Sequence, residues 1–295
     1  MTRFQSLVPM VFVLLLAACS TTSPRSDAAL KIAAWNLEHL AENDDSGCRP
    51  RKEADYAVLR AHVERLDADV IAFAEVETRK AAERVFDPAR YVVVMSERPD
   101  SGRQGFCGRN ATDGPTIRKQ DVGFAVRKSV TFTRHADVRA LALGDPDLRW
   151  GVDITLDGPN PLRLLAVHLK SGCARGAEYE ACPILFDQVP VLKQWIDARR
   201  AEGSAFAVLG DWNRRLALPG DDVWQRLNAG SELIDAAGGR RATCVERYPD
   251  YIDHIVLDPR AASRVTPGSF EEFDYGVAEA EHPSDHCPVS VRVAR

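Results

Sequence analysis

Six short segments at the ends of apolar runs in this sequence carry side chains that could bind a metal ion, hold phosphate or move a proton. These segments are 35–38, 69–75, 167–171, 210–213, 251–254 and 284–288. Carboxylates and amides are the ligands of hard cations, and imidazoles donate or accept protons near neutral pH. A phosphodiester repels a nucleophile until cations or hydrogen-bond donors neutralise its charge, so this set of residues suits phosphoester cleavage.

The order of the six segments resembles the endonuclease/exonuclease/phosphatase superfamily, which includes DNase I-like nucleases, abasic-site endonucleases, neutral sphingomyelinases and inositol polyphosphate phosphatases. The resemblance covers residues 30–293 and rests on all six segments, because each short motif alone is a weak signal. It implies a metal-dependent phosphoric ester hydrolase. It also implies a four-layer α/β sandwich, in which helices flank two packed mixed sheets.

The expected metal ligands are oxygen donors. We expect Glu75 to be the principal ligand, with Asn36 and Asp285 nearby, because Mg²⁺ takes few protein carboxylates and keeps several waters. Mg²⁺ is the expected ion, and Mn²⁺ or Ca²⁺ are the alternatives. One residue departs from the family pattern, since Ala74 stands where many relatives have Gln before the metal-binding Glu.

His286 is the expected protonatable group. By resemblance, Asp253 is the carboxylate that orients it, and such a pair should raise the pKa of the imidazole. Resemblance also implies that Asp211 orients and deprotonates the attacking water and that Asn213 donates hydrogen bonds to phosphorane oxygens. His168 occupies a position where sphingomyelinase-like and DNase I-like members carry His and abasic-site enzymes tend to carry Tyr.

Further residues are expected to contact substrate. They are Glu38, Lys170, Ser171, Arg109 and Arg118. The last two lie in a polar, Gly-rich stretch from 98 to 120 that lacks helical or strand periodicity, which is typical of a functional or a solvated loop. This stretch, together with Arg214 and Arg215, offers local positive charge and favours nucleic acid as the substrate.

Other functions remain open at this stage. A phospholipid phosphodiesterase of sphingomyelinase type comes second, and a phosphomonoesterase of inositol-phosphate type third. A binding lipoprotein that keeps the fold without the catalysis is the alternative of a different class. The intact motifs argue against that last alternative.

Short apolar runs bounded by turn residues predict strands, and they outnumber the predicted helices. The expected strands are 30–36, 69–74, 91–95, 121–127, 150–156, 162–168, 205–210, 252–257 and 287–293. Helical patterning is clearest at 52–66, 184–200 and 222–227. No glycine-rich nucleotide fingerprint opens a helix, so this mixture favours an α/β sandwich over a doubly wound nucleotide-binding fold.

The first residues read as an export signal. Arg3 precedes an apolar run from 7 to 18 that is short for a membrane span and ends in small residues. The sequence before Cys19 resembles a bacterial lipobox, which implies lipidation at Cys19 and a signal peptide at 1–18. We therefore expect a tether at 19–29, a catalytic domain at 30–295 and a membrane-anchored monomer outside the cytoplasm. Ser20 favours the outer membrane.

Export would place the other six cysteines in an oxidising compartment, where disulfides form. Cys173 with Cys182 is the favoured pair because the two are close in sequence, and Cys48 with Cys107 would join two long loops. Cys244 with Cys287 is the least supported pairing.

Composition narrows the classes of partner. The chain has 295 residues, of which 45% are hydrophobic, and a formal net charge of −5. These values fit one large globular domain and do not fit a strongly cationic, sequence-blind DNA binder. Any contact with a polyanion must therefore be local.

Overall fold

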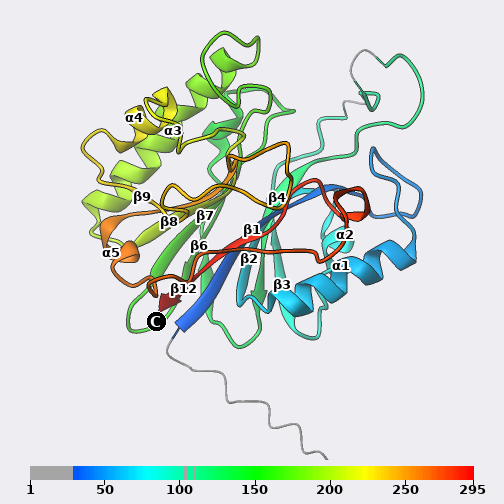
Figure 1. Cartoon of the computed structure of the whole chain (residues 1–295). Helices are drawn as coiled ribbons and strands as arrows, with labels where there is room; N and C mark the ends of the chain where they lie inside the picture. Colours follow the sequence, from blue (N-terminus) through cyan, green and yellow to red (C-terminus); the bar gives the residue numbers. More distant parts are fainter. Residues whose placement is uncertain (1–28, 103–104, 109–110) are drawn as a thin grey trace, which may run out of the picture.

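Two six-stranded mixed sheets pack face to face, and helices cover their outer faces (Figure 1). The computed structural model describes residues 29–102, 105–108 and 111–295. The expected α/β sandwich is therefore confirmed. The proposed signal peptide and the lipidation site at Cys19 lie outside the described residues.

The first sheet has the strand order β11-β12-β1-β2-β4-β3. Its strands are β1 (Ala29–Leu40), β2 (Val70–Val76), β3 (Tyr91–Met95), β4 (Asp121–Arg127), β11 (Glu271–Glu272) and β12 (Val289–Ala294). β1 and β2 are parallel, and the other pairs are antiparallel. The central strands are buried on both faces, which explains their nearly continuous apolar sequences.

The second sheet has the order β5-β6-β7-β8-β10-β9. Its strands are β5 (Phe132–Arg134), β6 (Val152–Leu156), β7 (Leu162–His168), β8 (Phe206–Asp211), β9 (Ile234–Asp235) and β10 (Asp253–Leu257). Among the described residues of this sheet, β7 and β8 form a parallel pair, and the other neighbouring strands are antiparallel. Both sheets therefore have a parallel pair near the middle, and these pairs carry the expected site residues Asn36, Glu38, Glu75, His168 and Asp211.

Side chains from both sheets form the central core. Ile32, Ala72 and Phe124 of the first sheet pack in one cluster with Leu164 and Leu209 of the second. Because side chains alternate along a strand, the neighbouring residues face outward and contact the helices. This alternation produces the separate outer clusters, one on each side of the sandwich.

The helices lie outside the sheets. They are α1 (Glu53–Leu66), α2 (Arg79–Glu83), α3 (Cys182–Ala201), α4 (Asp222–Asn228) and α5 (Pro259–Ala262), with 3-10 turns at Arg139–Ala142 and Glu279–Glu281. α1 and α2 cover the first sheet, whereas α3 and α4 cover the second (Figure 1). No helix in the described ranges is long and apolar enough to cross a membrane.

The predicted long elements are present with small shifts at their ends. β1 runs to Leu40 rather than ending at residue 36, because it continues through an irregularity after Asn36. The segments that pattern analysis did not predict are short, namely α2, α5, β5, β9 and β11. The described residues of the stretch from 98 to 120 form no helix or long strand and lie beside the sheets (Figure 1), with one isolated bridge between Phe106 and Thr116.

Three disulfides fix loops onto the sandwich. Cys48 pairs with Cys107, Cys173 with Cys182 and Cys244 with Cys287. The favoured pairing of Cys173 with Cys182 is thus confirmed, and the least supported pairing, Cys244 with Cys287, is also formed. Cys287 directly follows His286, so the last disulfide joins a distant loop to the candidate site.

Candidate active site

The backbone leaves regular strand geometry where the site residues lie. Glu38, His39 and Glu75 have positive φ angles of 44°, 52° and 60°. The pairing of β1 with β2 shifts register over the same residues. Non-glycine residues in this left-handed region are strained, and such strain is concentrated at functional sites where the fold enforces it. At Glu38 and Glu75 the regular alternation of side chains between the two faces of the sheet is therefore interrupted.

Gly210 allows β8 to lie close to β7. Its φ is 139°, and a Cβ at this position would lie 2.1 Å from the carbonyl oxygen of Val167. Only glycine avoids that clash. The pairing that follows places His168 directly opposite Asp211.

Asp211 is a buried carboxylate surrounded by donors. Its Oδ2 accepts a hydrogen bond from Asn36 Nδ2 at 3.0 Å and lies 3.5 Å from His168 Nε2, while Oδ1 accepts the backbone N–H of Asn213 at 2.8 Å. Burial, reinforced by the charge of Asp253 and opposed by His286, raises the pKa of Asp211 to about 7. Asp211 is therefore suited to accept a proton near neutral pH.

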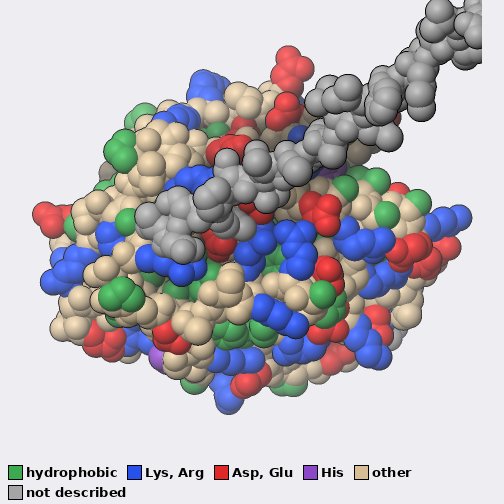
Figure 2. Space-filling view, turned by 90° about the horizontal axis from the view of Figure 1, so that it is seen from below, with side chains coloured by type: hydrophobic (Ala, Val, Ile, Leu, Met, Phe, Trp, Pro, Cys, Tyr) green, Lys and Arg blue, Asp and Glu red, His purple; other side chains and the backbone are tan. Residues whose placement is uncertain are grey.

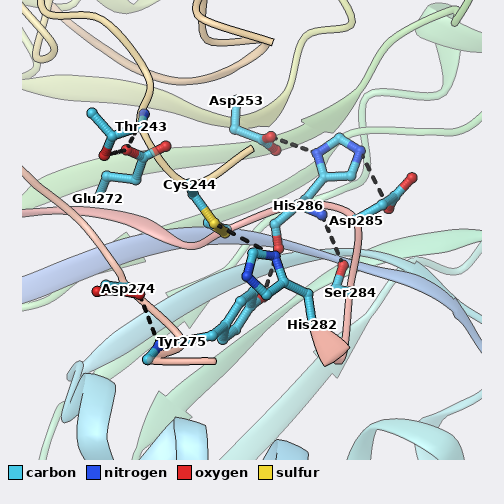
Figure 3. The surroundings of a disulfide bond; sticks show 12 residues. Thr243, Cys244, Asp253, Glu272, Asp274, Tyr275, His282, Ser284, Asp285 and His286 are labelled. Carbon is cyan, nitrogen blue, oxygen red and sulfur yellow. Dashed lines mark hydrogen bonds and ion pairs between the residues drawn. A yellow bond between two sulfur atoms is a disulfide. The ribbon is translucent and has the colours of Figure 1, made fainter. Parts of the chain in front are cut away.

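His286 is held by Asp253 as expected. Its Nδ1 lies 2.6 Å from Asp253 Oδ2 (Figure 3). Its Nε2 lies 3.9 Å from Asp211 Oδ2. Burial opposes the charged imidazolium, but the carboxylates of Asp253 and Asp211 outweigh it and raise the pKa of His286 well above that of a free imidazole. The protonated ring can offer its Nε2–H to an anionic oxygen.

Glu75 lies near His39 and His168. One carboxylate oxygen accepts the backbone N–H of His39 at 3.0 Å, and the other lies 3.7 Å from His168 Nε2. Burial, with nearby cations such as Arg149, lowers the pKa of His168 well below its ordinary value. His168 is therefore a neutral imidazole, and its Nε2 lies between the carboxylates of Glu75 and Asp211. The Glu75 oxygen that faces it has no charged hydrogen-bond donor at this position.

Glu38 and Asp285 form a second acidic pair. The backbone N–H of Asp285 donates to Glu38 Oε2 at 3.0 Å, and Arg49 Nη1 lies 3.2 Å from Glu38 Oε1. Burial and the charge of Asp285 raise the pKa of Glu38. Ser284 Oγ, which donates to the Asn36 carbonyl at 2.7 Å, fixes this segment against β1.

The donor chemistry fits a hard divalent cation. Glu75 and Asp285 offer carboxylate oxygens, and Asn36 presents its Oδ1, which already accepts the Glu38 N–H at 2.9 Å. Mg²⁺ takes few protein carboxylates and keeps several waters, so the partly buried Glu75 together with the exposed Asp285 suits it. Ala74 is buried in the inter-sheet core, so no side chain from this position supports Glu75.

Two groups of potential ligand atoms occur among the described residues. Asp211, Asp253 and His286 form one, and Cys244, His282 and Cys287 form the other. The two cysteines of the second group are joined in a disulfide, so their thiolates are not available to a metal. In the first group the carboxylate of Asp253 is already bonded to His286, which favours proton handling over metal binding.

Two of the remaining expected residues line a groove of about 420 Å³ that also includes Arg149. Lys170 and Arg118 line it, and Ser171 is exposed next to Lys170. Asn213 Nδ2 donates one of its two hydrogens to the Leu169 carbonyl at 3.2 Å. Arg109 lies outside the described residues, and its role stays a prediction.

The expectation of free positive charge is wrong for part of this region. Arg98 is buried and lies 2.8 Å from Asp121, and Arg214 is buried and lies 2.6 Å from Asp221. Arg118 is exposed enough to reach solvent but also lies 2.6 Å from Glu77. Acidic partners neutralise these guanidinium groups, so Arg98, Arg118 and Arg214 supply less free positive charge than the sequence suggested.

Sequence reasoning missed two residues at the site. Arg149 donates to the carbonyls of His168 and Leu169 at 3.3 and 2.8 Å and so holds the end of β7. His39 lies with Nε2 at 3.6 Å from Glu75. Arg149 stands before an unremarkable strand and gives no sequence signal, whereas His39 follows Glu38 directly and could have been considered with it.

The chain matches the model of the Endonuclease/Exonuclease/phosphatase family over residues 33–286. Members of this family hydrolyse phosphoric esters, and divalent metal ions are typical of them. No protein of curated function matches the chain in sequence.

Several solved structures share the fold. The human Nocturnin catalytic domain with bound sulfate has 16% identity, with a TM-score of 0.62 over 90% of this chain and 95% of that chain. The AP endonuclease LMAP from Leishmania major has 14% identity and a TM-score of 0.61 over 96% and 93%. Truncated TDP2 from Caenorhabditis elegans has 14% identity and a TM-score of 0.59 over 90% and 98%. At these identities the likeness shows the fold alone. The family match covers the candidate active site, and it identifies the chain as a member of the Endonuclease/Exonuclease/phosphatase family.

Proposed function

We propose that this protein is a divalent-metal-dependent phosphodiesterase that cleaves nucleic acid outside the cytoplasm. The observation that carries the proposal is the convergence of Asp211, His286 and Asp253, with atom pairs 2.6 to 3.9 Å apart, beside the carboxylate of Glu75. A proton acceptor, a held imidazolium and a ligand for a hard cation are the groups that phosphodiester hydrolysis needs.

In this proposal Asp211 orients the attacking water and takes its proton as the new O–P bond forms. The bond from phosphorus to the leaving oxygen breaks on the opposite side, and that oxygen takes a proton from solvent. His286 donates its Nε2–H to a phosphoryl oxygen, and Asp253 fixes the ring through Nδ1. His168 and Asn213 add neutral hydrogen-bond donors at the rim of the same centre.

A divalent cation held by Glu75, with Asn36 and Asp285 as further oxygen ligands, would neutralise charge on a phosphoryl oxygen as a Lewis acid. Mg²⁺ is the first choice, and Mn²⁺ or Ca²⁺ are the alternatives. Glu38 lies 3.0 Å from the backbone N–H of Asp285 and positions that segment against β1.

Nucleic acid is the proposed substrate. Among the proteins that share this fold is an AP endonuclease, and the Nocturnin domain holds a sulfate anion. Lys170, Ser171, Arg109 and Arg118 are the proposed contacts to the substrate outside the reacting phosphate.

The proposed location rests on the N-terminal sequence. A lipobox-like Cys19 would carry acyl chains that attach a monomer to the outer membrane. The three disulfides support an oxidising compartment, because such bonds are rare in a reducing cytosol.

A substrate panel tests this function. The purified protein is assayed with Mg²⁺, Mn²⁺, Ca²⁺ or EDTA against plasmid DNA, RNA, sphingomyelin and bis(4-nitrophenyl) phosphate. We expect metal-dependent cleavage of a nucleic acid and of the artificial diester. Cleavage of sphingomyelin alone would replace nucleic acid by phospholipid, and failure with every substrate and metal would favour a non-catalytic binding protein.

A further inference from the structure

A mostly apolar cavity of about 320 Å³ opens beside the catalytic histidine. Asp253, Asp285 and His286 line it, so a group that enters it would lie next to a phosphate held at His286. Its remaining wall includes Val245, Tyr248, Tyr251 and Ile252. A concave apolar site with a few polar groups is the usual form of a small-molecule binding site.

Tyr248 is the exposed aromatic residue of this wall. Its side chain is 49% exposed, and the guanidinium of Arg247 lies 4.9 Å from its ring centroid. Tyr251 is buried and packs edge-on against Phe270, so its orientation is fixed. Tyr248 can therefore stack on a planar group, whereas Tyr251 forms part of the fixed wall.

Polar groups at the cavity rim could pair with the edge of such a planar group. Arg215 and Asp250 are partly buried, with side chains 19% and 32% exposed, and Arg215 Nε lies 3.7 Å from Asp250 Oδ2. Both Arg215 and Asp250 line the cavity, which therefore offers a donor and an acceptor beside its aromatic wall. This combination of a stacking face with hydrogen-bonding groups matches a heterocyclic base better than a lipid chain.

The segment that forms the wall is attached to the sheets at two points. The Cys244–Cys287 disulfide joins it to the residue after His286, and Glu272 accepts hydrogen bonds from both Thr243 N and Thr243 Oγ at 2.7 Å. Figure 3 shows these residues around His286 and Asp253. The cavity is thus fixed relative to the catalytic histidine, as a specificity pocket requires.

We propose that this cavity binds the nucleobase next to the scissile phosphate, with Tyr248 as its stacking residue. The inference rests on the proposed function and specifies its substrate. A base within a duplex is stacked and paired, so it can enter a cavity only after it leaves the helix. The protein should therefore prefer single-stranded or unpaired nucleotides.

The test compares phosphodiesters that differ only in their bases. Thymidylyl-thymidine is compared with two analogues in which either the first or the second thymine is replaced by hydrogen. The variants are Tyr248→Ala, Tyr248→Phe and the matched control Tyr179→Ala, since Tyr179 is 42% exposed and does not line the cavity. Thermal unfolding of each variant verifies that it is folded.

Wild-type protein should hydrolyse the base-bearing diester more efficiently than at least one base-lacking analogue. The measured ratio is kcat/KM for the base-bearing diester divided by kcat/KM for the base-lacking analogue. Stacking on an aromatic residue contributes about a 5- to 100-fold effect, so Tyr248→Ala should reduce this ratio by that amount, mainly through KM. Tyr248→Phe should keep the ratio, and Tyr179→Ala should match wild type. Val245→Trp, which fills the cavity, should reduce the ratio as Tyr248→Ala does.

Two negative results have different meanings. If wild type hydrolyses neither thymidylyl-thymidine nor bis(4-nitrophenyl) phosphate with any metal, the proposed function fails. If it hydrolyses both but the ratio is the same in wild type, Tyr248→Ala and Val245→Trp, the base pocket is wrong while the function stands. Equal cleavage rates for a single strand and its duplex would also overturn the preference for unpaired nucleotides.

Discussion

At the scale of single residues, Asp211 and Glu75 are neighbouring carboxylates with different surroundings. Asp211 is buried, accepts two hydrogen bonds and has a pKa raised to about 7. Glu75 accepts one backbone hydrogen bond and keeps its other oxygen near His168 at 3.7 Å. The first environment suits proton transfer and the second suits metal binding, so substitutions at the two positions should fail in different ways.

Glu75→Gln should weaken metal binding, because an amide is a poorer ligand than a carboxylate, and its activity should recover partly as Mg²⁺ or Mn²⁺ is raised. Asp211→Asn keeps the shape but removes the proton acceptor. We expect a loss of turnover of about 10²-fold or more that added metal does not restore, with KM little changed. Steady-state kinetics over a metal titration measure both. Near-normal turnover in folded Asp211→Asn would contradict the proposed role.

At the scale of elements, strand β10 presents consecutive residues to opposite sides. Asp253 points to the candidate site, whereas His254 is buried on the other side. His254 Nδ1 lies 3.0 Å from Asp235 Oδ2 of β9, and its Nε2 lies 2.9 Å from the Arg214 carbonyl. Both ring nitrogens thus face acceptors, and a doubly protonated imidazolium satisfies them. This ion pair fixes β9 and the loop after β8 to the strand that carries Asp253.

The His254–Asp235 pair predicts a specific pH dependence of stability. Despite burial, Asp235 raises the pKa of His254, so this contribution is complete below about pH 6.5, the unfolded value, and is lost as pH rises through the higher folded pKa. Despite burial, His254 lowers the pKa of Asp235, so this contribution is present above about pH 4 and is lost as pH falls. Stabilisation by the pair is therefore largest between these values.

Asp235→Asn should reduce the free energy of unfolding by about 3 kcal/mol within that pH window, because it leaves a buried imidazolium without its counter-ion. The difference from wild type should shrink as pH rises above the folded pKa of His254. Urea unfolding at a series of pH values measures this. A difference that does not vary with pH would show that the pair is not ionised in the folded protein.

The disulfides should stabilise the fold unequally, because they close loops of different length. Cys244 and Cys287 are separated by 43 positions, and Cys173 and Cys182 by 9. Loop-closure entropy predicts that removing the longer link costs about 4 kcal/mol and the shorter about 3 kcal/mol. Urea unfolding of the two double Ser variants gives both values. A larger loss for the Cys173/Cys182 variant would mean that local packing, rather than loop closure, determines the effect.

At the scale of the whole molecule, acidic residues slightly outnumber basic ones, at 43 against 38. The formal net charge is −5. Figure 2 shows the face of the molecule at which β1 begins, and basic and acidic side chains are interspersed on its visible part. With Arg98 and Arg214 paired internally, binding to a polyanion depends on the few groups around the candidate site. Attachment to a membrane would depend on the N-terminus instead.

Cys19→Ser should release the protein from the membrane, because this one residue is proposed to carry the acyl chains. Ser20→Ala is the matched control and should remain membrane-bound. Fractionation of membranes and soluble material after expression in a Gram-negative host measures the distribution. A Cys19→Ser variant that stays in the membrane fraction would exclude lipid anchoring at this residue.

Much of the fold follows from the sequence alone. Apolar runs that end in turn residues located the long strands, and helical periodicity located α1 and α3, because burial of one face imposes those patterns. Residues such as Asp211 and His286 were identified because they lie at the ends of such strands in a recognisable order. Short elements such as α2 and β9 were missed, since two to five residues carry too little periodicity.

The tertiary structure decided which of these residues meet and in what charge state. Asn36 and Asp211 are 175 positions apart and form a hydrogen bond because the two sheets pack together. The same packing buries Asp211 enough to raise its pKa, places Arg149 and His39 at the site, and gives Arg98 and Arg214 acidic partners. Local sequence contains no record of such contacts, because desolvation and ion pairing depend on distances that exist only after the chain has folded.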